Sequence, residues 1–277
     1  MDLDLSILDR PPLRIPDGAI ELYPRPMGPR IFLLPKEDRV LKVGISVKLS
    51  EAEAMRFVAR ETSMPVPTVH DAYEQEGRGY IIMSRAHGKP LGEVWASLCT
   101  EQISTIVRQL NRCMAELATL SGDFYGTLWK SPVEDIFFHH QPFENEKIQY
   151  GPYFSREEYN AGLVAALMNS RPEQSLSASD QALAEKVLQI DDERRVFSHG
   201  DLHLDNIIID DSCRVTGIVD WAGAGFSIPG RDYYEAISRA REEKWVESVS
   251  CIFSKDSQVH YELFRELDSA LILYTCI

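Results

Sequence analysis

The chain has 277 residues, of which 44% are apolar and 26% charged, a composition typical of a soluble globular protein that can bury a core. Lys and Arg total 29 against 43 Asp and Glu, and the resulting net charge of −14 is opposite in sign to that of a nucleic acid binder. We therefore expect one large or two modest domains and no nucleic acid partner.

Cysteine usage and the N-terminus indicate a cytoplasmic protein. The five cysteines are scattered and include no Cys-x-x-Cys pair, which is typical of reduced thiols. The first residues are acidic, whereas a signal peptide begins with basic residues and continues with an apolar run. The longest apolar runs, such as 161–168, are much shorter than a membrane span. We therefore expect neither secretion nor a membrane partner.

The first third of the chain has the pattern of a small β-rich unit. Period-two apolar runs predict four strands, with a Gly-Arg-Gly turn joining the last two as a hairpin, at 31–34, 39–43, 68–73 and 80–83. One helix is predicted between the second and third strands. Ser50 followed by Glu53 fits a capping box at its start, and Pro65-Val-Pro67 ends it. The expected order is β-β-α-β-β.

Beyond residue 90 the apolar period changes from two to 3.6, which favours helices. We predict helices near 103–117, 156–168, 180–189 and from about 232 onward, with 170–181 as a surface loop. A second hairpin interrupts them at 206–210 and 215–220. The pattern predicts an α+β fold with two lobes, a small β-rich one and a larger helical one, which meet near 84–90. Ligands commonly bind between such lobes.

The most informative stretch is Ser198-His-Gly-Asp201, followed by Asn206 and, across the hairpin, by Asp220-Trp221. A hairpin of this length can bring the side chains of Asp201, Asn206 and Asp220 to one end. Carboxylate and amide oxygens are the ligands that Mg²⁺ prefers, with water and substrate phosphates completing its shell. The spacing therefore indicates a site for phosphoryl transfer.

These segments resemble the aminoglycoside phosphotransferase and choline kinase-like family, small-molecule kinases with the bilobal protein-kinase-like fold. The resemblance implies an N-lobe over 1–86, a C-lobe over 87–277, and ATP and Mg²⁺ as cofactors. It implies that Asp201 accepts the acceptor's hydroxyl proton, that His199 supports the catalytic loop, and that Asn206 and Asp220 hold Mg²⁺.

Charge balance also requires a cation facing the phosphates. Lys42 lies in a predicted strand with apolar neighbours and matches the strand lysine of the family. Its helix partner is either Glu51, which shares a face with the apolar stripe, or Glu53, the better capping residue; we favour Glu51. The family further implies that adenine binds the linker backbone, at a place marked by Met83, Ser84 and Ala86.

Two segments depart from the family pattern. The phosphate-covering loop falls near 26–30 and holds a single glycine between two prolines. The acidic residue that anchors the catalytic loop is expected to be Glu235. An alternative zinc site at His199 and His203 is disfavoured, because no third ligand lies at suitable spacing.

The acceptor is expected to be a small molecule with a hydroxyl group. An aromatic segment at 137–154, interleaved with acids that include Glu144 and Glu157, could line its site and would favour a cationic acceptor. The alternative is that the aromatics pack the lobe and the acids face water. The leading function is an ATP- and Mg²⁺-dependent phosphotransferase; the alternatives are a nucleotide-binding pseudokinase and a phosphate-ester hydrolase.

Overall fold

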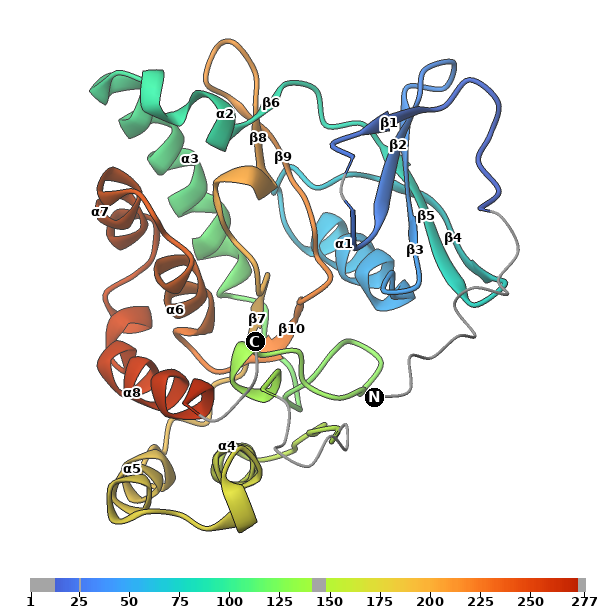
Figure 1. Cartoon of the computed structure of the whole chain (residues 1–277). Helices are drawn as coiled ribbons and strands as arrows, with labels where there is room; N and C mark the ends of the chain where they lie inside the picture. The colour runs from blue at the N-terminus through green and yellow to red at the C-terminus, as the bar shows by residue number, and fades with distance from the viewer. Residues whose placement is uncertain (1–12, 25, 141–147, 274–277) are drawn as a thin grey trace.

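The computed structural model describes residues 13–24, 26–140 and 148–273 and has the expected α+β architecture with two lobes (Figure 1). A five-stranded sheet with one helix forms the N-terminal lobe, at the right of Figure 1, and helices dominate the other lobe. Within the described ranges, no helix is both long and apolar enough to cross a bilayer.

The sheet is antiparallel throughout and follows the order β1-β2-β3-β5-β4. Its strands are β1 (Ile20–Leu22), β2 (Arg30–Leu34), β3 (Arg39–Gly44), β4 (Val69–Gln75) and β5 (Arg78–Ser84). All four predicted strands are present, and β4 and β5 form the predicted hairpin. Sequence reasoning missed β1, because a three-residue edge strand is too short to show an alternating pattern.

Helix α1 (Leu49–Glu61) lies between β3 and β4 in the chain, as predicted, but its start differs from the prediction. The N-cap is Lys48, which makes no side-chain cap, so the capping box predicted at Ser50 is wrong. Packing sets the position of the helix instead. Its buried face includes Met55 and Val58, which belong to the main core.

The second lobe is mainly helical. Its helices are α2 (Leu91–Val94), α3 (Thr100–Leu117), α4 (Arg156–Asn169), α5 (Ala178–Leu188), α6 (Arg231–Ser238), α7 (Glu243–Ile252) and α8 (Tyr261–Ile272). Short 3₁₀ turns are η2 (Trp95–Ser97), η3 (Ile136–Phe138), η4 (Pro172–Gln174), η5 (Leu204–Asn206) and η6 (Asp256–Gln258). The predicted helices agree with α3, α4 and α5 to within a few residues.

Two small sheets lie within the helical lobe. The predicted second hairpin is formed by β8 (Ile207–Ile209) and β9 (Val215–Ile218), and β6 (Lys89–Pro90) joins its edge. A separate pair, β7 (Val196–Ser198) and β10 (Gly225–Ser227), flanks the loop that carries Asp201. The two sheets therefore support both sides of the His-Gly-Asp segment.

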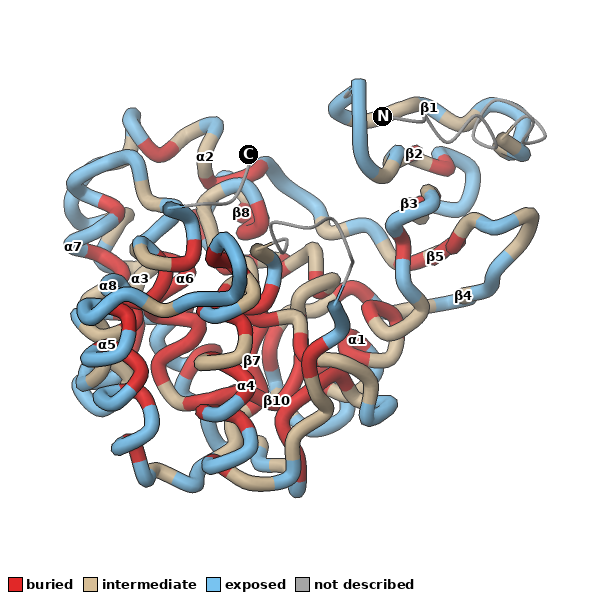
Figure 2. The backbone as a smooth tube through the Cα atoms, turned by 60° about the horizontal axis from the view of Figure 1, so that its bottom comes forward, coloured by how far each residue is buried: buried red, intermediate tan, exposed pale blue. Residues whose placement is uncertain are grey.

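The main hydrophobic core extends through both lobes. Met55 and Ile81 of the N-terminal lobe belong to the same buried cluster as Trp95, Ile218 and Trp221. Figure 2 shows that buried backbone is concentrated around α1, β7 and β10, whereas β4 is largely exposed. Phe57 of α1 contacts the rings of Phe197 on β7 and Phe226 on β10, so this shared core holds α1 against the helical lobe.

Most of the segment 170–181 lies at the surface, as its polar composition predicted, but the side chains near its two ends are buried, and it contains η4 and the first turn of α5. The guanidinium of Arg171, whose side chain is 2% exposed, pairs with Asp180 at 2.6 Å and donates a hydrogen bond to the carbonyl of Ala270 on α8. Ser177 caps α5 with a complete capping box. A buried ion pair thus fixes this segment to the helical lobe.

Candidate active site

The loop after β7 depends on a glycine. Gly200 has φ of 79°, in the left-handed region that favours glycine. A Cβ at this position would lie 2.3 Å from Nη2 of Arg231 and 2.5 Å from the carbonyl oxygen of Gly223. The chain can therefore make this turn beside α6 only where the side chain is absent.

His199 supports this loop from inside the protein. Its ring is fully buried, with Nε2 3.1 Å from the carbonyl oxygen of Val219 and Nδ1 3.1 Å from the backbone N–H of Asp201. These partners require a proton on Nε2 and a free lone pair on Nδ1. Burial lowers the pKa of His199 to about 4, so the ring is neutral at physiological pH. The structure therefore places His199 where it positions Asp201.

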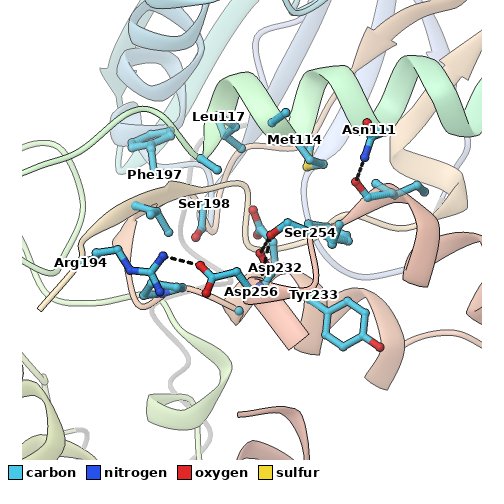
Figure 3. Close-up of a pocket in the computed structure, with 18 residues that line it drawn as sticks. Asn111, Met114, Leu117, Arg194, Phe197, Ser198, Asp232, Tyr233, Ser254 and Asp256 are labelled. Carbon is cyan, nitrogen blue, oxygen red and sulfur yellow. Dashed lines mark hydrogen bonds and ion pairs between the residues drawn. The ribbon is translucent and has the colours of Figure 1, made fainter. Parts of the chain in front are cut away.

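The predicted catalytic loop is anchored by Asp232, in the first turn of α6. Its carboxylate accepts hydrogen bonds from the backbone N–H groups of His199 at 3.0 Å and Gly200 at 2.8 Å. Figure 3 shows Asp232 and Ser198 at a cavity that Met114 of α3 also lines. The cavity measures about 180 Å³. Asp232, which holds the loop, therefore also lines this cavity.

The expectation that Glu235 anchors the loop is wrong. Glu235 accepts a hydrogen bond from Nε of Arg231 at 3.0 Å, and the same guanidinium pairs with Asp135 at 2.8 Å. Because Asp232 and Glu235 lie three residues apart on α6, they point to neighbouring partners. Only the packing of α6 against the loop decides which of them reaches it.

The hairpin brings the predicted metal ligands close together. Ile207 pairs with Ile218 in the hairpin. The pairing continues one step beyond the strands, where the N–H of Val219 donates a hydrogen bond to the carbonyl of Asn206 at 2.9 Å. The amide Nδ2 of Asn206 donates to the carbonyl of Asp201 at 2.9 Å. Asp220 follows with φ of 65°, a left-handed backbone that turns the chain directly after Val219.

Lys42 links the two lobes through two carboxylates. Its Nζ lies 2.7 Å from Oε1 of Glu51 and 2.7 Å from Oδ1 of Asp220. Glu53 instead pairs with Arg56 on the surface of α1. Burial opposes the charge on Lys42, yet Glu51 and Asp220 together raise its pKa. Burial likewise opposes the charge on Asp220, and Lys42 more than offsets it, so the pKa of Asp220 is lowered.

The side-chain oxygens of Asp220 and Asn206 are suitable ligands for a hard divalent cation. The side chain of Asp220 is 42% exposed, and no donor among the described residues contacts Oδ1 of Asn206. Over the same ranges, no group of three or more His, Cys, Asp and Glu side chains could hold a metal. Mg²⁺ commonly takes one or two protein oxygens and completes its shell with water and phosphates. The zinc alternative fails, because both ring nitrogens of His199 are already engaged.

The linker residues expected near adenine lie at the end of β5. Met83 is buried in the main core, and Ser84 Oγ accepts the backbone N–H of Thr68 at 2.9 Å. Ala86 lies directly over Gly217 of β9. A Cβ added to Gly217 would lie only 2.4 Å from the Cβ of Ala86. The glycine-poor loop of 26–29 connects β1 to β2, with Gly28 at φ of 95°. Adenine contacts by this linker stay a prediction.

The aromatic segment forms a second core. Phe137, Phe138 and Tyr150 are buried in a cluster with Tyr159 and Phe264, so these rings do not line a binding site. For these three rings, the alternative that the aromatics pack the lobe is confirmed. Of the acids, Glu157 is exposed on α4, and Glu144 lies outside the described residues.

Sequence reasoning missed the partners of Asp201. Nη1 of Arg239, which follows α6, pairs directly with Oδ1 of Asp201, and Nε2 of His203 lies 3.5 Å from the same oxygen. Burial raises the pKa of Asp201, while Arg239 and His203 act in the opposite direction. Arg239 lies 38 residues after Asp201 and carries no motif, so no signal in the sequence could have found it.

A sheet lysine that pairs with a helix glutamate and with the aspartate after the hairpin is what the resemblance to the kinase-like phosphotransferases implied. The chain belongs to the phosphotransferase enzyme family, whose sequence profile matches residues 46–262, more than half of its length. The match begins just after Lys42, so the profile does not cover this residue. The position of Lys42 in the site is known from the structure alone.

Two further comparisons found similar proteins. A crystal structure from Ralstonia eutropha JMP134, provisionally assigned as an aminoglycoside phosphotransferase, superposes with a TM-score of 0.56 at 17% identity, covering 95% of this chain and 78% of that one. This likeness shows the fold. Subtelomeric hrmA-associated cluster proteins from two strains of Aspergillus fumigatus are 31% identical over 113 residues. That stretch is 39% of this chain and only 22% of those relatives.

Proposed function

We propose that the protein is a kinase that transfers the γ-phosphate of MgATP to a hydroxyl group of a small molecule. The observation that carries the proposal is the ion triad in which Lys42 meets both Glu51 and Asp220, beside the loop that carries Asp201 and Asn206. Such an enzyme uses cellular ATP, which implies a cytoplasmic location.

In this reaction Asp201 orients the acceptor. Its carboxylate accepts a hydrogen bond from the hydroxyl, whose oxygen attacks the γ-phosphorus while the bond from that phosphorus to the β,γ-bridging oxygen breaks and ADP leaves. The hydroxyl proton passes to Asp201 and then to water. The transition state is loose, so alignment matters more than base strength. Burial, which raises the pKa of Asp201, assists the proton transfer.

The remaining residues hold the nucleotide. Lys42 would bind the α and β phosphates, with Glu51 fixing its direction. Asp220 and Asn206 would hold Mg²⁺, which neutralises charge on the transferring group when bound. The short β1–β2 loop offers few backbone donors, so the side chains carry most of the phosphate binding.

The test separates this proposal from the two alternatives. Asp201→Asn should bind MgATP with an unchanged Kd but transfer phosphate at least about a hundredfold more slowly, because general-base alignment contributes that much. Asp211→Asn, an exposed change at the hairpin turn, is the matched control. Acceptors are screened as a hydroxylated library, with products read by mass spectrometry.

Each alternative predicts a different result. A pseudokinase binds MgATP and transfers phosphate to nothing, in the parent and in the variant alike. A hydrolase releases inorganic phosphate and never phosphorylates an added alcohol. Either result would overturn the proposed kinase activity.

A further inference from the structure

Arg239 occupies the place where an acceptor must bind. It follows the last residue of α6, and its guanidinium pairs with Oδ1 of Asp201, the oxygen that the proposed function assigns to the acceptor's hydroxyl. The Arg239 side chain is 38% exposed, so a ligand can reach it. Any acceptor that approaches Asp201 therefore arrives beside a permanent positive charge.

A cavity of about 630 Å³ lies next to this ion pair, on the side of the helical lobe. Its walls are the end of the catalytic loop with η5, Gly92 of α2, and the connection between α6 and α7. Arg239 belongs to the wall and also contacts Asp201, so it joins the cavity to the point of transfer. The volume is within the usual range for small-molecule sites.

Both basic and acidic side chains line this cavity. Arg239 and Arg241 are permanent cations, and His203 is a third basic group. The acids are Asp205, whose Oδ1 lies against Gly92, and Glu242, the N-cap of α7.

Within the described part of the chain, no acidic side chain pairs with Arg241. Its guanidinium is therefore available to a ligand without breaking an existing ion pair, whereas Arg239 must first leave Asp201.

We infer that the acceptor is a hydroxy acid, whose hydroxyl binds Asp201 while its carboxylate binds Arg239 and Arg241. This inference rests on the proposed function. A hydroxyl that takes the place of Arg239 on Asp201 leaves a guanidinium without its counter-ion, and a carboxylate on the same small molecule restores that ion pair. Guanidinium groups bind carboxylates in a two-pronged geometry that an ammonium acceptor cannot use. A cationic acceptor, which the acids of the aromatic segment favoured, would instead place its ammonium group beside the guanidinium of Arg239 when its hydroxyl reaches Asp201.

The first experiment compares acceptors that differ only in charge. Two series are used with the whole protein and MgATP: glycerate, glycerol and 3-amino-1,2-propanediol, and 4-hydroxybutyrate, 1,4-butanediol and 4-aminobutanol. A wider set of hydroxy acids with their alcohol and amine counterparts is added. The kcat/KM of the best acid should exceed that of its alcohol by at least about tenfold and that of its amine by more, because an ion pair replaces a repulsion.

The outcomes distinguish the hydroxy acid acceptor from the kinase activity itself. Transfer that favours alcohols or amines overturns the hydroxy acid and leaves the kinase activity standing. Failure to bind MgATP, or binding without transfer to any compound, contradicts the proposed kinase itself and the inference with it.

The second experiment uses Arg241, because it does not contact Asp201. Arg241→Gln should raise the KM for the hydroxy acid about tenfold with kcat and the KM for MgATP little changed, and Arg241→Lys should recover most of this loss. Arg241→Glu should shift the ratio of kcat/KM between acid and amine about a hundredfold toward the amine. Arg112→Gln, an exposed change on α3, is the control. An unchanged acid-to-amine ratio in Arg241→Glu would refute the role of this residue.

Discussion

Lys42 on β3 and Glu51 on α1 form an ion pair that is almost fully withdrawn from water: their side chains are 6% and 1% exposed, and Nζ lies 2.7 Å from Oε1. The pair fixes the direction of α1 relative to the sheet. It also holds Lys42 where Asp220, on the opposite lobe, can reach it. The proposed nucleotide site and the fold therefore depend on the same contact.

The first prediction concerns the stability of this pair. Lys42→Met should lower the free energy of unfolding by about 3 kcal/mol, because it leaves Glu51 buried as an unpaired charge. Adding Glu51→Gln should restore at least about 1 kcal/mol, since the charge is then removed as well. Denaturant unfolding of the two single variants and the double variant measures the coupling.

An exposed pair provides the control for that cycle. Lys186 and Glu266 are 2.9 Å apart with side chains about half exposed. The corresponding cycle there should give a coupling below about 1 kcal/mol, because solvent screens the charges. Equal couplings for the two pairs would show that burial of Glu51 does not determine the energy.

The second prediction concerns Gly200. Gly200→Ala and Gly18→Ala both place a side chain at φ of 79°, but a Cβ at Gly18 meets nothing within 4 Å. The backbone cost of about 1 kcal/mol should be common to both. Gly200→Ala must also displace Arg231 or Gly223, so it should lose roughly 1–3 kcal/mol more. It should also lose kcat, which Gly18→Ala retains.

Thermal unfolding and steady-state kinetics on the two glycine variants provide the measurement. If Gly200→Ala matches Gly18→Ala in both, the close approach of α6 to the loop is not what requires glycine at this position.

The third prediction is a pH dependence that arises from His199. Its pKa is about 4 in the folded protein against an ordinary value of 6.5. As the pH falls below 6.5, the unfolded chain binds a proton that the folded protein does not, so stability is lost progressively down to pH 4. Between pH 6.5 and 5 this loss amounts to about 2 kcal/mol.

The measurement is the difference between the parent protein and His199→Asn. Glu235, whose pKa burial raises to about 7, changes stability in the opposite direction over the same range, so only the difference isolates His199. The variant should be less stable at pH 7.5, because it loses both ring contacts, yet its stability should fall less as the pH is lowered to 5. Parallel stability curves would contradict the neutral, buried ring.

The sequence by itself determined the elements and the family of this protein. Apolar periods of two and 3.6 identified four of the five strands of the N-terminal sheet and the long helices, because these patterns record which faces are buried. The His-Gly-Asp motif and the hairpin after it placed Asp201, Asn206 and Asp220 together, because the hairpin register is local and short. Lys42 followed from charge balance and its strand.

The tertiary structure alone decided which side chains meet. Glu51 and Glu53 on α1, and Asp232 and Glu235 on α6, are similar acids on one helix, and only the packing of each helix selects the one that reaches Lys42 or the catalytic loop. The contact between Arg239 and Asp201 joins residues far apart in the chain. Local periodicity records burial and carries no information on how packed elements lie relative to one another, so such contacts arise only when the whole chain has folded.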